Sequence, residues 1–280
     1  MKRLFIAATL ATLLAHRAFG QTGIGLADPS TATLYLRDSL SNGAPDTTFS
    51  FGAPGWTYFA GDWNGDGTQT IGVYNPSTAT FYLRNSNSAG SSDATFTFGS
   101  PGWKPIIGDW NDDGTDTIGI VDPTTNTFYL RNSNTAGAPD ITFTFGAPGF
   151  TPLAGNWDGL GGDGIGLYDP ATGTFYLRNS LSSGAPDAVF AFGAPGWKPI
   201  PGDWNNDGAD TIGVVDPATG TFYLRNSNTA GGADITPFQF GTGSDQPFSF
   251  QTIPEPSTLA LLLTSIALYG SRRRRRTRDC

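Results

Sequence analysis

A 47-residue repeat limits what this chain can fold into. Gly61–Gly67 reads GDWNGDG, Gly108–Gly114 reads GDWNDDG and Gly202–Gly208 reads GDWNNDG, while a degraded copy begins GNWD at Gly155. A fixed period of this size is the signature of stacked supersecondary units. The fold must therefore be built from copies of one small unit.

The repeated unit has the pattern of four short β-strands. Alternation with a period of two places Phe143 and Phe145 on one face and Thr142 and Thr144 on the other. Gly, Pro, Asn and Asp separate the apolar runs, and the repeat shows no helical periodicity. This is typical of a four-stranded antiparallel blade. In the copy that starts at Lys104, we expect the strands at 104–110, 117–121, 127–131 and 141–146.

The two ends of the repeat array complement each other. The first copy begins at Gly23 and lacks its leading strand, and Gln246–Phe250 follows the fifth copy where a leading strand belongs. A C-terminal strand that completes the first blade would close a ring and remove exposed strand edges. We therefore predict an all-β fold, a five-bladed β-propeller, with an open linear β-array as the alternative. The predicted propeller spans 21–252, with blade 1 at 22–55 plus 246–252, blade 2 at 56–102, blade 3 at 103–149, blade 4 at 150–196 and blade 5 at 197–243.

Aromatic pairs recur in the third strand of the later blades. We expect them to pack between blades rather than to contact a ligand. They are Phe81, Tyr82, Phe128, Tyr129, Phe175, Tyr176, Phe222 and Tyr223.

Residues 1–20 have the anatomy of a secretory signal. Lys2 and Arg3 precede an apolar stretch from Leu4 to Ala15, and small residues follow at Ala18 and Gly20. The apolar stretch is too short to span a bilayer, which argues against the alternative of a membrane anchor. We expect cleavage before residue 21 and export of the rest.

The C-terminal segment, 253–280, has a different composition. A Pro-Glu-Pro sequence precedes a short apolar run from Leu259 to Tyr269 and then a cluster of arginines. This order resembles the PEP-CTERM sorting signal, although a plain tail anchor is the alternative. The resemblance implies transient insertion in the inner membrane through the C-terminal helix, an exosortase-type sorting enzyme as partner, and release to the cell surface or the outside. The residues that carry it are Pro254, Glu255, Pro256, Arg272, Arg273, Arg274, Arg275 and Arg276.

Charge and composition exclude several functions for the region between these ends. It holds 7 Lys or Arg and 22 Asp, a net charge of −15, which repels nucleic acid and attracts cations. It holds no cysteine and no histidine, since Cys280 and His16 lie outside it. A thiol nucleophile, a Ser-His-Asp triad and a histidine-bound metal are therefore excluded.

The acidic segments offer hard oxygen ligands at alternate positions. Side-chain oxygens fall at the first, third and fifth positions, and a glycine at the sixth permits a sharp turn, which suits Ca²⁺. The alternative is a turn in which Asp and Asn bond their own backbone. An EF-hand is excluded because the region has no Glu. We expect about three Ca²⁺ sites, formed by Asp62, Asn64, Asp66, Thr68 and Thr70, by Asp109, Asn111, Asp113, Thr115 and Thr117, and by Asp203, Asn205, Asp207, Ala209 and Thr211.

The fourth copy of the segment and the first blade depart from this pattern. Asn156 and Leu160 replace two donors in the fourth copy, so we expect its site to be empty or weak. The first blade has Gln251 at the first position.

The repeated acidic segment followed by Thr-Ile-Gly-Val-Tyr resembles the FG-GAP/VCBS repeats of surface proteins. That resemblance implies propeller blades with calcium in the loop between the first two strands. The family commonly has Asp at the ninth loop position, where this chain has Thr, while Asp116 and Asp210 lie one residue earlier. The number and length of the repeats are also similar to the tachylectin group of sugar-binding propellers.

These patterns together indicate a non-enzymatic, exported binding or adhesion module that acts on an extracellular polysaccharide or a surface protein. A tachylectin-like lectin is the alternative, and an enzyme that uses an aspartate pair on glycans is a further one. Saccharide contacts would come from Arg37, Arg84, Arg131, Arg178 and Arg225, with Trp56, Trp103, Phe150 and Trp197 nearby. The structural alternative pairs each arginine with an aspartate of the adjacent blade and places each Trp in the gap between blades.

Overall fold

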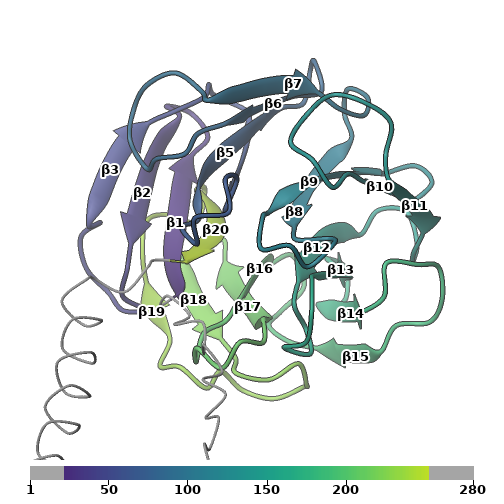
Figure 1. Cartoon of the computed structure of the whole chain (residues 1–280). Helices are drawn as coiled ribbons and strands as arrows, with labels where there is room; N and C mark the ends of the chain where they lie inside the picture. The colour runs from purple at the N-terminus through teal and green to yellow at the C-terminus, as the bar shows by residue number, and fades with distance from the viewer. Residues whose placement is uncertain (1–21, 252–280) are drawn as a thin grey trace, which may run out of the picture.

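The computed structural model describes residues 22–251, and every regular element in this range is a β-strand. The strands form five separate four-stranded antiparallel sheets, arranged as blades around a centre (Figure 1). The predicted five-bladed β-propeller is confirmed. The predicted signal (1–20) and sorting segment (253–280) lie outside the described residues. Within 22–251 no helix has the length and apolar character needed to cross a membrane.

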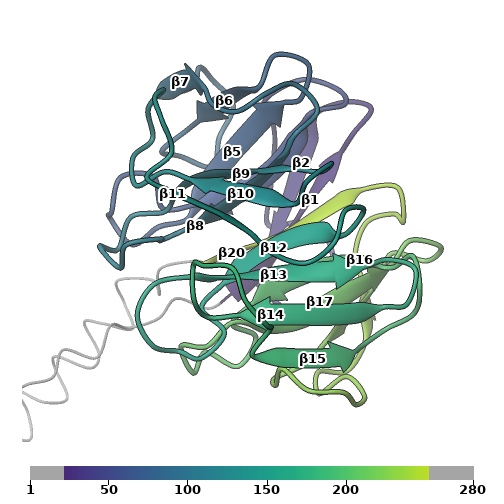
Figure 2. The same cartoon turned by 90° about the vertical axis from the view of Figure 1, so that its right-hand side faces the viewer.

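Each blade runs from an innermost strand near the centre to an outermost strand at the rim (Figure 2). Blade 1 comprises β20 (Gln246–Gln251), β1 (Thr22–Asp28), β2 (Thr33–Arg37) and β3 (Thr47–Ser50). Blade 2 comprises β4 (Thr57–Gly61), β5 (Thr70–Asn75), β6 (Thr80–Leu83) and β7 (Ala94–Thr97). Blade 3 comprises β8 (Lys104–Gly108), β9 (Thr117–Asp122), β10 (Thr127–Leu130) and β11 (Ile141–Thr144). Blade 4 comprises β12 (Thr151–Gly155), β13 (Gly164–Asp169), β14 (Thr174–Arg178) and β15 (Ala188–Ala191). Blade 5 comprises β16 (Lys198–Gly202), β17 (Thr211–Asp216), β18 (Thr221–Leu224) and β19 (Phe238–Gln239).

The last strand closes the ring as predicted. β20 pairs antiparallel with β1, with Phe248 opposite Gly25, so blade 1 is assembled from both ends of the described chain. β20 also lies beside β16 of blade 5 and β4 of blade 2. The innermost strands of all five blades thus surround the centre without a gap (Figure 1).

A glycine in the second strand of each blade accommodates a large side chain from the innermost strand. Phe59 lies opposite Gly72, where an added Cβ would come 2.3 Å from its ring. Phe248 lies in the same way over Gly25, at 2.2 Å. The glycine of the repeated Ile-Gly-Val/Ile/Leu sequence is therefore required by packing.

The core consists of five apolar clusters, and each lies between two neighbouring blades. Leu34 and Phe51 of blade 1 pack with Val73 of blade 2, and Leu26 of blade 1 packs with Phe222 of blade 5. Blade 1, which both ends of the described chain build, thus has an apolar cluster on each side, as the other blades do. The predicted inter-blade role of the repeated phenylalanines is confirmed, because each is buried in a cluster with residues of the next blade; they are Phe81, Phe128, Phe175 and Phe222. Burying one such side chain contributes roughly 1.5–3 kcal/mol.

Candidate functional site

The four acidic loops connect the innermost strand to the second strand in blades 2 to 5, at residues 62–69, 109–116, 156–163 and 203–210. Because the blades are related by rotation about the centre, these loops lie on one side of the ring. There they border a central cavity of about 980 Å³, lined by residues of all five innermost strands. The acidic loops and this cavity form the candidate site.

In blades 2, 3 and 5 the aspartate at the first position closes the acidic loop. Asp62 Oδ1 accepts a hydrogen bond from Asp66 N at 3.1 Å, and Oδ2 accepts one from Gly67 N at 2.6 Å. Asp109 and Asp203 accept the same two bonds in their loops. The glycine at the sixth position has a positive φ, +87° at Gly67, as the sharp turn requires.

The third and fifth positions bond to each other. Asn64 Nδ2 donates to Asp66 Oδ2 at 2.9 Å, and Thr68 N donates to Asp66 Oδ1 at 2.8 Å. The bond from Asn64 is the largest cause that lowers the pKa of Asp66, and the amide of Thr68 adds to it. Asn111 and Asn205 make the equivalent bonds in their loops.

The remaining predicted calcium ligands have structural partners. Thr115 and Ala209 donate their amides to the fifth-position carboxylates, as Thr68 does. The three ninth-position hydroxyls donate to a carbonyl of the innermost strand; they are Thr70, Thr117 and Thr211.

The acidic loops carry oxygen ligands of the kind that calcium prefers, but these oxygens accept hydrogen bonds from amide groups of the same loop. Within 22–251 no three acidic side chains are grouped so that they could hold a metal ion. Binding would therefore require the loop side chains to exchange amide partners for the ion.

The fourth loop keeps its shape with fewer carboxylates. Leu160 N donates to Asn156 Oδ1 at 3.1 Å and to Asp158 Oδ1 at 2.9 Å. Asn156 Nδ2 donates to the carbonyl of Gly161, which retains a positive φ of +73°. The turn itself thus needs no aspartate at the first position.

The last residues of the loops in blades 3, 4 and 5 are Asp116, Asp163 and Asp210, which we call the carboxylate cluster. The sequence did not reveal their role. Asp62 N donates to Asp116 Oδ2 at 2.7 Å, and Asp116 N donates to the Asp62 carbonyl at 2.8 Å. Asp163 binds Asp109, and Asp210 binds Asn156, through the same two bonds. Each cluster residue therefore joins its own blade to the preceding one. Their shared 47-residue spacing was the available signal.

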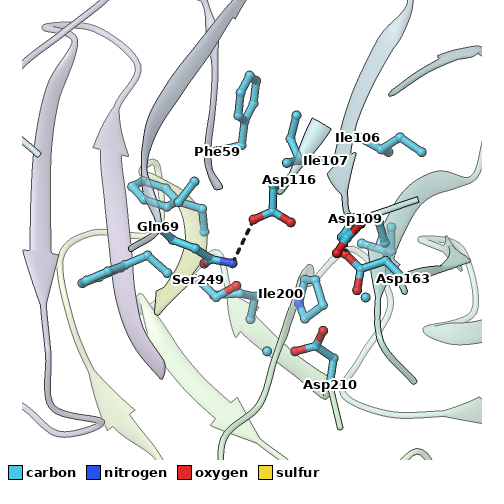
Figure 3. Close-up of a pocket in the computed structure, with 18 of the residues that line it drawn as sticks. Phe59, Gln69, Ile106, Ile107, Asp109, Asp116, Asp163, Ile200, Asp210 and Ser249 are labelled. Atoms are coloured by element: carbon cyan, nitrogen blue, oxygen red, sulfur yellow. Dashed lines mark hydrogen bonds between the residues drawn. The ribbon is translucent and has the colours of Figure 1, made fainter. Parts of the chain in front are cut away.

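In blades 1 and 2 the residue at the cluster position is not an aspartate. Gln69 occupies the cluster position in blade 2, where its Oε1 accepts a bond from Gln251 N at 2.9 Å. Its Nε2 donates to Asp116 Oδ2 at 3.3 Å (Figure 3). Thr22 occupies the position in blade 1 and its Oγ1 has no hydrogen-bond partner within the described residues.

Burial raises the pKa of every carboxyl in the cluster. Desolvation is the largest cause, and it raises the pKa of Asp116 to about 7 and that of Asp210 to about 6. The pKa of Asp163 is raised well above its usual range by desolvation and by the charges of Asp116 and Asp210. At neutral pH the cluster therefore holds carboxylates that the fold makes costly to ionise.

The five repeated arginines brace their own outer loops. Arg37 donates to the carbonyls of Ser41, Asn42 and Ala44, and Arg131 donates to those of Ala136 and Ala138. The equivalent bonds occur at Arg84, Arg178 and Arg225. Within 22–251 none of these arginines bonds an aspartate, so the expected inter-blade pairing does not occur.

Aromatic stacks line the grooves between blades on the side away from the acidic loops. Trp56 stacks on Tyr82 with ring centroids 4.8 Å apart, and both pack against the core between blades 1 and 2. Equivalent stacks join Trp103 to Tyr129, Phe150 to Tyr176 and Trp197 to Tyr223. A smaller cavity of about 420 Å³ lies beside Trp56 and Tyr82, with Thr31, Ser50 and Ser92 in its lining.

The fold and the site together define a five-bladed β-propeller with acidic loops on one side of a central cavity. No model of a known protein family matches the chain, and no curated protein matches it. The resemblances to FG-GAP/VCBS repeats and to the PEP-CTERM signal therefore rest on their motif residues alone.

Proposed function

We propose that the protein is a non-enzymatic binding module, exported and displayed at the cell surface or in the matrix. A closed ring of five equivalent blades carries the proposal, because a rigid scaffold that presents loops on one side is suited to recognition. The absence of histidine and cysteine from 21–252 supports a non-enzymatic role. Export, sorting by an exosortase-type enzyme and transient membrane insertion rest on the sequence patterns at the two ends.

Calcium is the cofactor that this proposal assigns to the acidic loops of blades 2, 3 and 5. The support is the repetition of the same oxygen donors in three loops, together with a net charge of −15 between residues 21 and 252. In the fourth loop Leu160 is 76% exposed and offers no oxygen from its side chain. We therefore assign no calcium ion to the loop of blade 4.

A pull-down from the producing cell's envelope and polysaccharide tests the binding function. The purified propeller is immobilised in millimolar calcium or in EGTA, and bound polymer and protein are eluted and identified. A saturable partner that is lost when the propeller is unfolded supports the proposal. Recovery of the same material by the unfolded chain, or of nothing, would refute it.

A carbohydrate-binding function is the second candidate, and one observation favours it. The cavity beside Trp56 and Tyr82 combines an aromatic stack with hydroxyl groups, which is the chemistry that a sugar face requires. The arginines contribute little to this candidate, because their guanidinium groups bond their own loops. A glycan array that loses its signal in the Trp56→Ala variant would support it, and a blank array would exclude it.

A further inference from the structure

The central cavity has a second chemistry that the proposed function does not use. Its volume of about 980 Å³ falls at the upper end of small-molecule sites. The innermost strands of blades 2 to 5 contribute apolar side chains to the middle of the cavity; these are Phe59, Ile107, Ala154 and Pro201. Figure 3 shows Phe59 and Ile107 close to the carboxylate cluster.

Charge is distributed unevenly along the cavity. The carboxylate cluster lies beyond the C-terminal ends of the innermost strands, whereas Lys104 and Lys198 lie at the N-terminal ends of β8 and β16. A five-residue strand separates these positions by about 13 Å. Lys104 Nζ donates to the carbonyl of Phe150 at the start of blade 4, and Lys198 Nζ donates to those of Gly243 and Asp245, which lead into β20. Among the residues of 22–251 that line the cavity, no lysine or arginine therefore lies beside the carboxylate cluster.

The carboxylate cluster also has unused acceptors. Each of its aspartates bonds the neighbouring blade through Oδ2, and Oδ1 accepts no hydrogen bond from residues 22–251. Gly108 makes room for one of these side chains, because a Cβ there would lie 2.7 Å from Asp163 Oδ2. Figure 3 shows the three carboxylates around one end of the cavity.

An independent feature of the same ring indicates that a partner is missing. Thr22 lines the cavity at the position equivalent to the cluster residues and is 3% exposed. Its Oγ1 has no hydrogen-bond partner within the described part of the chain. Leaving a buried hydroxyl unpaired costs about 1–3 kcal/mol, so a ligand that supplied a donor here would relieve a cost of folding.

We propose that the central cavity binds an organic cation, a primary ammonium with an apolar body. The ammonium would lie at the acidic end of the cavity, where the Oδ1 atoms of Asp116, Asp163 and Asp210 and the hydroxyl of Thr22 are acceptors that residues 22–251 leave free. The body would extend between Phe59, Ile107 and Pro201 toward the lysine end.

Calorimetric titration of the full-length protein tests this site, at pH 8 and with EGTA present so that calcium plays no part. The probes are hexylamine, hexanol and hexanoate, which share a body and differ in charge. We expect hexylamine to bind one to one and the other two to bind at least about tenfold more weakly, since charge-assisted hydrogen bonds contribute at least that factor. Equal binding of all three probes, or no binding of hexylamine, would overturn the proposal.

Variants locate the binding. Asp163→Asn and the triple variant D116N/D163N/D210N keep a neutral acceptor for the inter-blade bond and remove the charge. We expect hexylamine affinity to fall about tenfold in the single variant and further in the triple. Asp93→Asn is the matched control, because Asp93 accepts a comparable bond from Asn85 N at 2.7 Å in an outer loop. If the triple variant does not fold, the single variant decides. Unchanged affinity in D163N would place the amine elsewhere and refute the site.

Discussion

At the residue scale, the carboxylate cluster has two opposing effects on stability. Its side chains join four blades through backbone hydrogen bonds, and their ionisation is opposed by burial and mutual repulsion. A neutral Asn in place of Asp116 could accept the same bond from Asp62 N without the charge. Natural proteins keep such costly groups mainly at functional sites, which agrees with a cation-binding role for the cavity.

The cluster predicts that stability falls as pH rises from about 4 to about 7. Because the folded pKa of Asp116, about 7, exceeds the usual 3.8, the folded state binds more protons than the unfolded state in this window. Asp116→Asn should raise the free energy of unfolding at pH 8 by on the order of 2 kcal/mol and change it little at pH 4. Chemical denaturation in EGTA at both pH values measures this. An equal effect at the two pH values would contradict the assignment.

Backbone conformation predicts a contrast between two glycines. Gly114 closes the loop of blade 3 with a φ of +85°, whereas an added Cβ at Gly232 meets nothing within 4 Å and its φ lies outside the left-handed range. Gly114→Ala should destabilise the protein by about 1–2 kcal/mol, and Gly232→Ala should be nearly neutral. Thermal unfolding of the two variants compares them directly. Equal melting temperatures would show that the loop relaxes around the new side chain.

At the scale of the element, the acidic loops show what the sequence could predict and what it could not. Their positions, their turn and the defect at Asn156 were predictable, because each depends on residues within one repeat. The inter-blade bond from Asp62 to Asp116 was not, since a repeat identifies equivalent residues but not the neighbours 54 positions apart. The arginines are a different case, because their partners are mostly backbone carbonyls of their own loops, and the sequence does not show which carbonyls turn toward a side chain.

The proposed calcium sites predict a cation-dependent melting temperature. A ligand that binds only the folded state adds about 2.7 kcal/mol per site at a free concentration 100 times its Kd. Millimolar calcium should therefore raise the melting temperature by several degrees relative to EGTA. The triple variant D62N/D109N/D203N should lose the shift, while Asp93→Asn keeps it. A melting temperature that calcium leaves unchanged in the unmodified protein would exclude the sites.

The fourth loop offers a gain-of-function test of the same idea. Asn156→Asp together with Leu160→Asp restores the first and fifth donors in a loop that already has the right turn. We expect the number of bound calcium ions, measured by titration with a calcium electrode, to rise from three to four. Restoring Leu160→Asp alone leaves the amide at the first position and should add less. An unchanged number would show that these donors do not define the site.

At the scale of the whole molecule, closure of the ring depends on β20. This strand covers the edge of β1 through register pairs from Thr22↔Gln251 to Ala27↔Gln246, and it buries Phe248 and Phe250. Two buried phenylalanines contribute roughly 3–6 kcal/mol, which is a large share of the stability of a typical domain. A chain that ends at residue 243 should therefore lose its sharp unfolding transition and aggregate through the exposed β1 edge.

Peptide rescue distinguishes loss of this strand from a general effect of truncation. A synthetic peptide of residues 244–252 can pair with β1 only if blades 1 and 5 are already positioned to receive it. We expect the peptide to restore a cooperative thermal transition to the chain ending at 243, and a chain ending at 252 to need no peptide. A peptide with Phe248→Asp should fail, because Gly25 leaves room for an apolar ring and offers no partner to a buried carboxylate. If the chain ending at 243 unfolds cooperatively without any peptide, four complete blades would suffice for the fold and closure would serve the cavity alone.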